Sequence, residues 1–264
     1  GLHGGHGRRA LAGGPGPLRA GILAAGLALL LGLPAAPAAS APPPLPGPWF
    51  RPVPVDGKVF PVLRPAQGRW LSFLDNFGEP ILEREDGKWR TVGRHEGVDV
   101  YADEGTPVVA MTAGVVERIG WTEFSGWRIG IQGTDGFFYF YGHLHSYVAG
   151  LKTGARVGAG ERLGYLGSSG YGPRGTSGNF PAHLHFGVQS AGRWRDPGKI
   201  VGSLYSAYVE RTRSDSRRLA RLENRARLLR SRMYGPGAPG KAGQELLAEI
   251  EGAEARLSRR LTVP

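Results

Sequence analysis

The sequence predicts a mainly β protein, an antiparallel sandwich or barrel followed by a C-terminal α-helical hairpin. Short alternating apolar runs punctuated by glycine, such as GVVERIGW and WRIGIQG, fill residues 57–198. Period-two alternation is typical of strands that place one face on a core. Beyond residue 198, apolar residues recur at helical spacing instead. With 44 Gly and 21 Pro in 264 residues, many turns between short strands are expected.

Residues 1–41 have the pattern of a secretory signal peptide. Residues 1–19 contain three arginines and no acidic residue, an apolar block follows at 20–33, and small residues with Ala-x-Ala spacing come next. The apolar block is too short to span a bilayer comfortably, and an uncleaved N-terminal anchor is the alternative. Both interpretations predict export of the rest of the chain, to the periplasm or the cell surface.

Two segments flank the predicted β domain. Residues 42–56 are dense in proline and predict an extended linker. Residues 199–264 predict the helical hairpin, with a break at GPGAPGKAG, residues 235–243. Between Val209 and Arg232, nine arginines outnumber three acidic residues. Two interpretations stay open: a solvated face that keeps the hairpin soluble, or a patch that binds an anionic membrane or wall polymer.

Charge and cysteine content restrict the partners and the chemistry. The formal net charge of +11 favours an anionic partner, and the expected export argues against nucleic acid. The chain has no cysteine, which excludes disulfides, thiolate zinc sites and catalytic thiols. Any metal must therefore be bound by His, Asp, Glu or water.

Five histidines lie inside the predicted β domain, and two segments repeat one triplet. YGHLHSY and PAHLHFGV each place two histidines around a leucine, at residues 143–145 and 183–185. Residues two apart in a regular strand point to the same side, so each triplet can supply two metal ligands, or one ligand and one acid/base group. The fifth, His95, precedes Asp99 by four residues. A His-Asp-His set with water in the fourth position is an open zinc site of the catalytic kind.

The order of these motifs identifies a family. His-x-Gly-x-Asp, Tyr-x-His-Leu, a glycine-rich turn and His-Leu-His-Phe follow one another within residues 73–196. This order resembles the lysostaphin-type (LytM-like) zinc metallopeptidases, which cut bacterial peptidoglycan. The resemblance implies an antiparallel β domain of the duplicated hybrid motif type, a Zn²⁺ cofactor, and hydrolysis of peptide cross-links by a metal-activated water. Peptidoglycan is anionic through its stem-peptide carboxylates, which suits a basic protein.

The resemblance also sorts the histidines. His95, Asp99 and His185 match the family's zinc ligands, and His143 and His183 match its two catalytic histidines. One of the two would take the proton from the attacking water while the other stabilises the oxyanion. The sequence leaves open which of them is the base.

Three further positions carry expectations. His145 stands where the family has a small polar residue, and we expect it to lie at the surface or behind the ligands. Phe77, in a Phe-Gly pair like the family's opening motif, and Tyr141, in Tyr-x-His-Leu, are candidate substrate-binding residues. The alternative function is a non-catalytic wall-binding protein or an activator of a partner wall hydrolase. Such relatives typically lose a ligand, whereas all five metal and catalytic positions are intact here.

Overall fold

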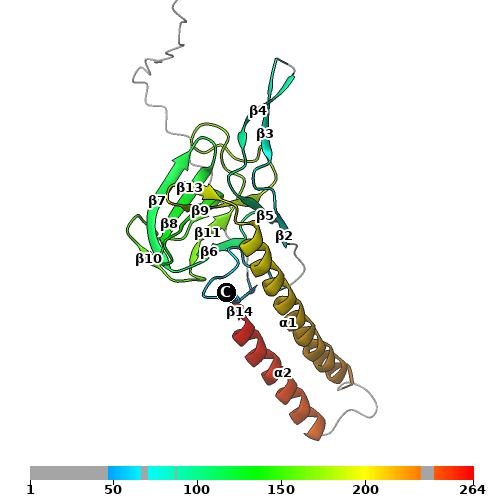
Figure 1. The fold of residues 1–264 in the computed structure, drawn as a ribbon. Coiled ribbons are helices and arrows are strands. Elements are labelled where there is room, and N and C mark those ends of the chain that lie inside the picture. Colours follow the sequence, from blue (N-terminus) through cyan, green and yellow to red (C-terminus); the bar gives the residue numbers. More distant parts are fainter. Residues whose placement is uncertain (1–46, 67–70, 87, 233–240) are drawn as a thin grey trace, which may run out of the picture. The chain divides into compact units, whose positions relative to one another are not determined.

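The computed structural model describes residues 47–66, 71–86, 88–232 and 241–264, and Figure 1 shows its ribbon. The predicted signal peptide lies outside the described residues. In chain order the elements are β1 (Trp49–Phe50), β2 (Leu71–Leu74), β3 (Pro80–Glu85), β4 (Lys88–Arg94), β5 (Val98–Ala102), β6 (Pro107–Val109), β7 (Gly114–Thr122), β8 (Gly126–Gly133), β9 (Phe138–Tyr147), β10 (Arg156–Val157), β11 (Arg162–Leu166), β12 (His183–Ser190), β13 (Arg193–Arg195), α1 (Gly198–Arg232), α2 (Lys241–Leu261) and β14 (Thr262–Val263).

The described strands confirm the predicted antiparallel architecture. A ten-stranded sheet follows the path β10–β7–β8–β9–β12–β5–β2, with β13 beside β12. Strand β11 pairs with both β6 and β9, so the sheet branches at β9. Strands β3 and β4 form a separate hairpin beside β2 and β5, as Figure 1 shows.

The core forms because alternate strand residues face inward. On β12, Leu184, Phe186 and Val188 are buried among the apolar side chains of neighbouring strands. Each such side chain contributes about 1.5–3 kcal/mol to folding through burial. His183 and His185 alternate with them, so both histidines lie on the opposite, outer face of the sheet.

Helix α1 begins inside the β domain. Val201, Leu204 and Tyr208 belong to the same core cluster as the strands. The Tyr208 hydroxyl accepts a hydrogen bond from Arg64 N at 2.9 Å and donates one to Phe50 O at 2.8 Å. The helix is a single element of 35 residues, and its first turns complete the β core.

Helices α1 and α2 pack together as the predicted hairpin (Figure 1). Ala226, Leu247 and Ile250 are buried between them, and Arg230 pairs with Glu251 across the interface at 2.6 Å. Among the described helices, none is both long and apolar enough to cross a membrane.

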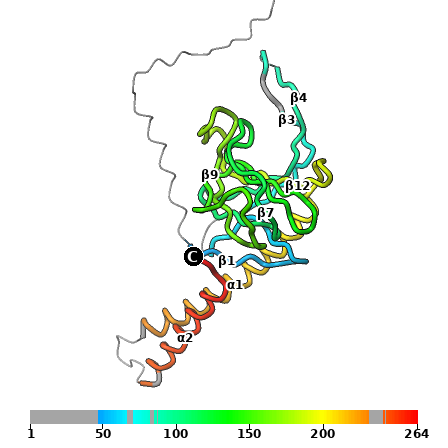
Figure 2. The backbone as a smooth tube through the Cα atoms, turned by 90° about the vertical axis from the view of Figure 1, so that its left-hand side faces the viewer, coloured from blue at the N-terminus to red at the C-terminus, as the bar shows by residue number. Residues whose placement is uncertain are grey.

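The segment predicted as a linker contains a strand. Strand β1 pairs with β14, which directly follows α2, and Figure 2 shows β1 close to the C-terminal end of the chain. Trp49 and Phe50 are only 2% and 1% exposed. The proline-rich sequence did not indicate this strand because its partner lies at the far end of the described chain.

Candidate metal centre

The pairing of β5 with β12 brings two of the predicted ligands together. The register places His185 directly opposite Asp99, and His95 lies in the turn just before β5. Gly97 permits this packing: a Cβ there would lie 2.7 Å from His185 Nε2 and 2.6 Å from Phe186 O. The glycine of the His-x-Gly-x-Asp motif thus leaves room for His185 against the turn that carries His95.

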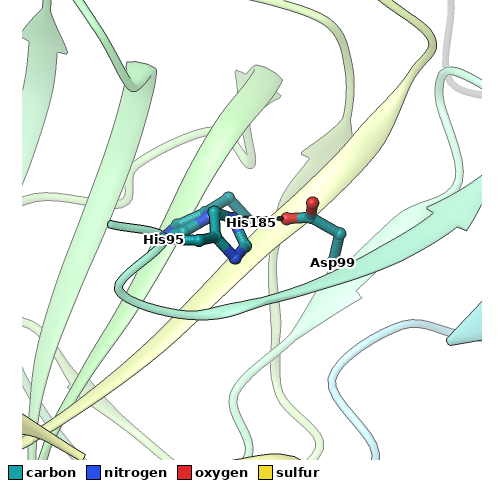
Figure 3. A group of neighbouring side chains, drawn as sticks. All are labelled: His95, Asp99 and His185. Atoms are coloured by element: carbon teal, nitrogen blue, oxygen red, sulfur yellow. Dashed lines mark hydrogen bonds and ion pairs between the residues drawn. The ribbon is translucent and has the colours of Figure 1, made fainter. Parts of the chain in front are cut away.

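The side chains of His95, Asp99 and His185 converge, as Figure 3 shows. His95 Nε2 lies 3.2 Å from Asp99 Oδ1, and His185 Nδ1 lies 3.4 Å from the same oxygen. The two ring nitrogens are 2.8 Å apart. A tetrahedral ion with bonds of roughly 2.0–2.2 Å holds its ligand atoms about 3–3.5 Å apart. The three residues therefore form a metal-binding triad.

The Asp99 carboxylate shows that a cation fits here. Asp99 is buried, and among the described residues its Oδ1 has no hydrogen-bond partner of good geometry. A buried charged oxygen without a partner is unfavourable unless a cation compensates it. Burial alone would raise the pKa of Asp99, but the adjacent His185 and His95 hold that pKa well below its usual range. The carboxylate is therefore ionised, as a ligand must be.

Asn76 holds the ligands in place, a role that no motif of the sequence predicted. Its Nδ2 donates to Asp99 Oδ2 at 2.8 Å, and its Oδ1 accepts from Asp99 N at 3.2 Å. Its backbone oxygen accepts a hydrogen bond from His95 Nδ1 at 3.2 Å, which leaves His95 Nε2 free to face the triad. The available signal was its position directly before the Phe-Gly motif.

The Phe-Gly motif supports the triad from behind. Gly78 N donates to His95 O, and His95 N donates to Glu79 O, both at 2.8 Å. Phe77, the candidate substrate-binding residue, is half-buried and packs against the core. These backbone hydrogen bonds fix the position of the loop that carries His95, a member of the triad.

His143 and His183 lie beside the triad. Their ring centroids are 4.8 Å apart, and His183 Nε2 lies 3.7 Å from Asp99 Oδ1. His143 Nδ1 donates to Ser169 O at 2.7 Å, and His183 Nδ1 donates to Pro181 O at 2.8 Å. In these tautomers each ring keeps its Nε2 lone pair available for proton chemistry.

Aromatic side chains enclose His143. Tyr171 stacks on its ring at 5.9 Å between centroids, and Phe180 meets it edge-on at 4.8 Å. Burial is the main cause that lowers the pKa of His143 to about 3, and the neighbouring His183 lowers it further. The His143 imidazole is therefore neutral at physiological pH.

His145 lies apart from the metal centre. Strand β9 pairs with β12 as far as Gly142 and with β11 from Leu144 onward. At this change of partner His143 has a φ of 59°, so the strand is not regular through the triplet. His145 Nδ1 instead lies 2.8 Å from Glu104 Oε1.

Tyr141 corrects one expectation. Its side chain is fully buried, and its hydroxyl accepts a hydrogen bond from Met111 N at 2.9 Å. A core side chain cannot contact a substrate, so Tyr141 is not a substrate-binding residue. Alternation along β9 places it on the inner face, a consequence that the motif alone does not show.

Fold and site together define an antiparallel β domain with an open, three-residue metal centre. Residues 93–197 match the model of Peptidase family M23, and this part of the chain belongs to that family.

Three relatives illustrate the match. The chain is 49% identical over 94 residues to the L-Ala--D-Glu endopeptidase of Bacillus subtilis (strain 168), covering 36% of this chain and 29% of that protein. It is 38% identical over 96 residues to the glycyl-glycine endopeptidase ALE-1 of Staphylococcus capitis, covering 36% and 24%. The catalytic domain of the peptidase lysostaphin from Staphylococcus simulans is 31% identical, with 51% of this chain and 92% of that chain covered and a TM-score of 0.38. The chain spans less than a third of the length of both curated relatives.

Proposed function

We propose that the protein is a zinc-dependent endopeptidase that hydrolyses peptide cross-links of bacterial peptidoglycan. The observation that carries this proposal is the convergence of His95 and His185 on the buried Asp99 Oδ1, which has no hydrogen-bond partner of good geometry among the described residues. Two more histidines beside it have Nε2 atoms available for proton chemistry. Family M23 membership of the segment supports the same activity.

The donor set favours zinc. Two imidazoles and one carboxylate, with a fourth position left for water, are typical of catalytic zinc sites. Zinc bound by His95, Asp99 and His185 would supply an acidified water and polarise the scissile carbonyl. Burial lowers the pKa of His185, which favours the neutral imidazole that a metal ligand must be.

The two remaining histidines, His143 and His183, have different roles in the proposed reaction. His143 is neutral, and its Nδ1–H is held by Ser169 O, so its Nε2 can accept a proton from the attacking water. His183 lies on the Asp99 side of the site. With a proton on Nε2, it can donate a hydrogen bond to the oxygen that gains charge as the peptide bond is attacked.

The site of action follows from the substrate. Peptidoglycan lies outside the cytoplasm, and the signal-like pattern of residues 1–41 supports export to the periplasm or cell surface. The names of the two curated relatives specify different bonds, L-Ala–D-Glu and glycyl-glycine. Family membership therefore does not select the scissile bond.

Mass spectrometry of digested muropeptides tests the proposal. The purified chain is incubated with muropeptides from several wall types, with and without a chelator, and then with zinc restored. We expect products that vanish with the chelator and return with zinc, and Asp99→Asn should give none. The absence of chelator-sensitive products from every wall type would reject the endopeptidase.

The helical hairpin supports a second candidate function, binding of an anionic wall polymer or membrane, as a non-catalytic binder or activator would do. Arg213, Arg217, Arg221 and Arg225 are exposed and recur every four residues, so they share one face of α1. Replacing all four by Gln should abolish salt-sensitive cosedimentation with purified wall or anionic vesicles. Unchanged cosedimentation would leave the arginines as a solvated face.

A further inference from the structure

A cavity of about 340 Å³ adjoins the metal centre at His185. Its other walls come from β7, β8, β9, β12 and β13 and the segments that flank them. The volume lies within the range of small-ligand pockets, roughly 300–1,000 Å³. The chemistry proposed above uses none of the cavity except His185 itself.

Aromatic rings form the part of the lining nearest the metal ligand. Phe140 meets the ring of His185 edge-on at 6.0 Å and the ring of Trp194 edge-on at 5.8 Å. Gly187 makes room for this arrangement, because a Cβ there would lie 2.5 Å from the Trp194 ring. An apolar surface thus leads from the triad into the cavity.

Two arginines make the far wall of the cavity basic. Arg118 on β7 and Arg128 on β8 belong to paired strands and both line the cavity. Arg118 lies over the Phe138 ring at 5.1 Å, and Arg128 Nε is buried without a hydrogen-bond partner in the described chain. Glu96 is the one acidic residue of the described lining, and the ion pairs found among the described residues include neither arginine.

A guanidinium with unused donors recognises a specific chemistry. Its planar N–H groups match the two oxygens of a carboxylate, and a buried donor without a partner is unfavourable until a ligand satisfies it. We infer that this cavity is a substrate subsite in which Arg128, assisted by Arg118, binds a carboxylate next to the scissile bond. The inference rests on the proposed endopeptidase function and specifies its substrate class.

The position of the cavity limits where that carboxylate can be. One extended residue spans at most about 3.3–3.6 Å, and His185 is both a triad member and a cavity wall. The carboxylate therefore belongs to a residue one or two positions from the bond that is cut.

The two catalytic histidines have aromatic neighbours. Tyr171 contacts His143, and Phe180 contacts His183. Arg118 and Arg128 are the basic residues of the cavity lining that adjoins His185. A peptide of glycine alone would leave both arginines of the cavity without a ligand.

The test compares three synthetic peptides on the whole chain with zinc. They are a wall stem peptide with a free glutamyl carboxylate, the same peptide with that carboxylate amidated, and polyglycine. We expect a KM about tenfold or more lower for the free carboxylate than for the amide, with similar kcat. Arg128→Gln should remove this difference in KM. Arg128→Lys should keep part of it, because lysine retains the positive charge but lacks the planar set of N–H donors of a guanidinium.

Matched controls separate the subsite from the activity. Arg259→Gln, at an exposed position of α2, should leave every KM unchanged. Calorimetry with His143→Ala measures binding of the same peptides without cleavage. Equal binding of the free and amidated peptides, or an Arg128→Gln variant that weakens both alike, would overturn the subsite. If the unmodified protein binds the free-carboxylate peptide preferentially but cuts none of the three peptides, the result would support the subsite and reject the endopeptidase function.

Discussion

The two His-Leu-His triplets have the same sequence and different structures. On β12, regular pairing with β5 continues through the triplet, while pairing with β9 begins at His185. The strand alternation turns His183 and His185 to one face of the sheet. On β9, the strand changes partner at the triplet, and His143 adopts a positive φ of 59°. His143 then faces the metal centre while His145 faces Glu104. Strand pairing, rather than the local motif, therefore determines what each histidine contacts.

The largest effect should come from the regular triplet. His185→Ala removes a triad ligand and leaves Asp99 Oδ1 with one fewer nitrogen beside it. We expect zinc content and peptidoglycan hydrolysis to be lost together, as measured by metal analysis and muropeptide release. A variant that kept stoichiometric zinc would show that His185 is not a ligand.

A smaller effect is expected from the irregular triplet. His143→Ala removes a proton acceptor but no triad atom, so zinc content should stay the same while kcat falls about 10²–10⁴-fold. Metal analysis and single-turnover kinetics on the same preparation measure both quantities. Full activity in this variant would contradict the catalytic role proposed for His143.

A substitution at Gly167 tests the importance of the point where β9 changes its pairing partner. At Gly167 a Cβ would lie 2.5 Å from His145 N and 2.7 Å from its Cα, so Gly167→Ala must push β9 from its neighbour. We expect a loss of about 1–3 kcal/mol in the free energy of unfolding and a lower kcat through displacement of His143. At Gly158 a Cβ would meet only Glu161 Oε2 at 3.8 Å, so Gly158→Ala is the matched control. Similar denaturation curves for both variants would contradict this account.

The protonation of His143 gives a pH test of the same packing. Burial lowers its pKa to about 3, against about 6.5 in an unfolded chain. Between these values the unfolded state binds the extra proton, so this residue makes the fold less stable as pH falls below about 6.5. NMR titration should show a neutral His143 ring down to pH 5. A midpoint near 6.5 would mean that the ring is solvated.

The smallest effect should come from His145. Its contact with Glu104 is partly exposed, and exposed side-chain contacts of this kind contribute about 0–1 kcal/mol. His145→Ala should therefore change thermal stability only slightly and leave zinc content and kcat unchanged. A large loss of activity would place His145 in the catalytic site after all.

Sequence patterns predicted the features that depend on residues close together in the chain. Alternation predicted the antiparallel strands, and the His-x-Gly-x-Asp spacing predicted that His95 and Asp99 act together. The contacts of Asn76 and Ser169 with the site were not predictable, because each depends on a segment brought close only by the sheet. The arginine wall was missed for the same reason, since Arg128 is one of many arginines until its unpartnered Nε is located.

The pairing of β1 with β14 has a practical consequence for anyone who trims this protein to a minimal catalytic fragment. Cutting the chain after β13 would remove the partner strand of Trp49 and Phe50 and the helix turns that contribute Leu204 and Tyr208 to the core. Large aromatic surfaces would then be exposed to water, and the fragment would be prone to aggregation. A soluble fragment should instead keep β1 through β14 and shorten the two helices together at their distant ends.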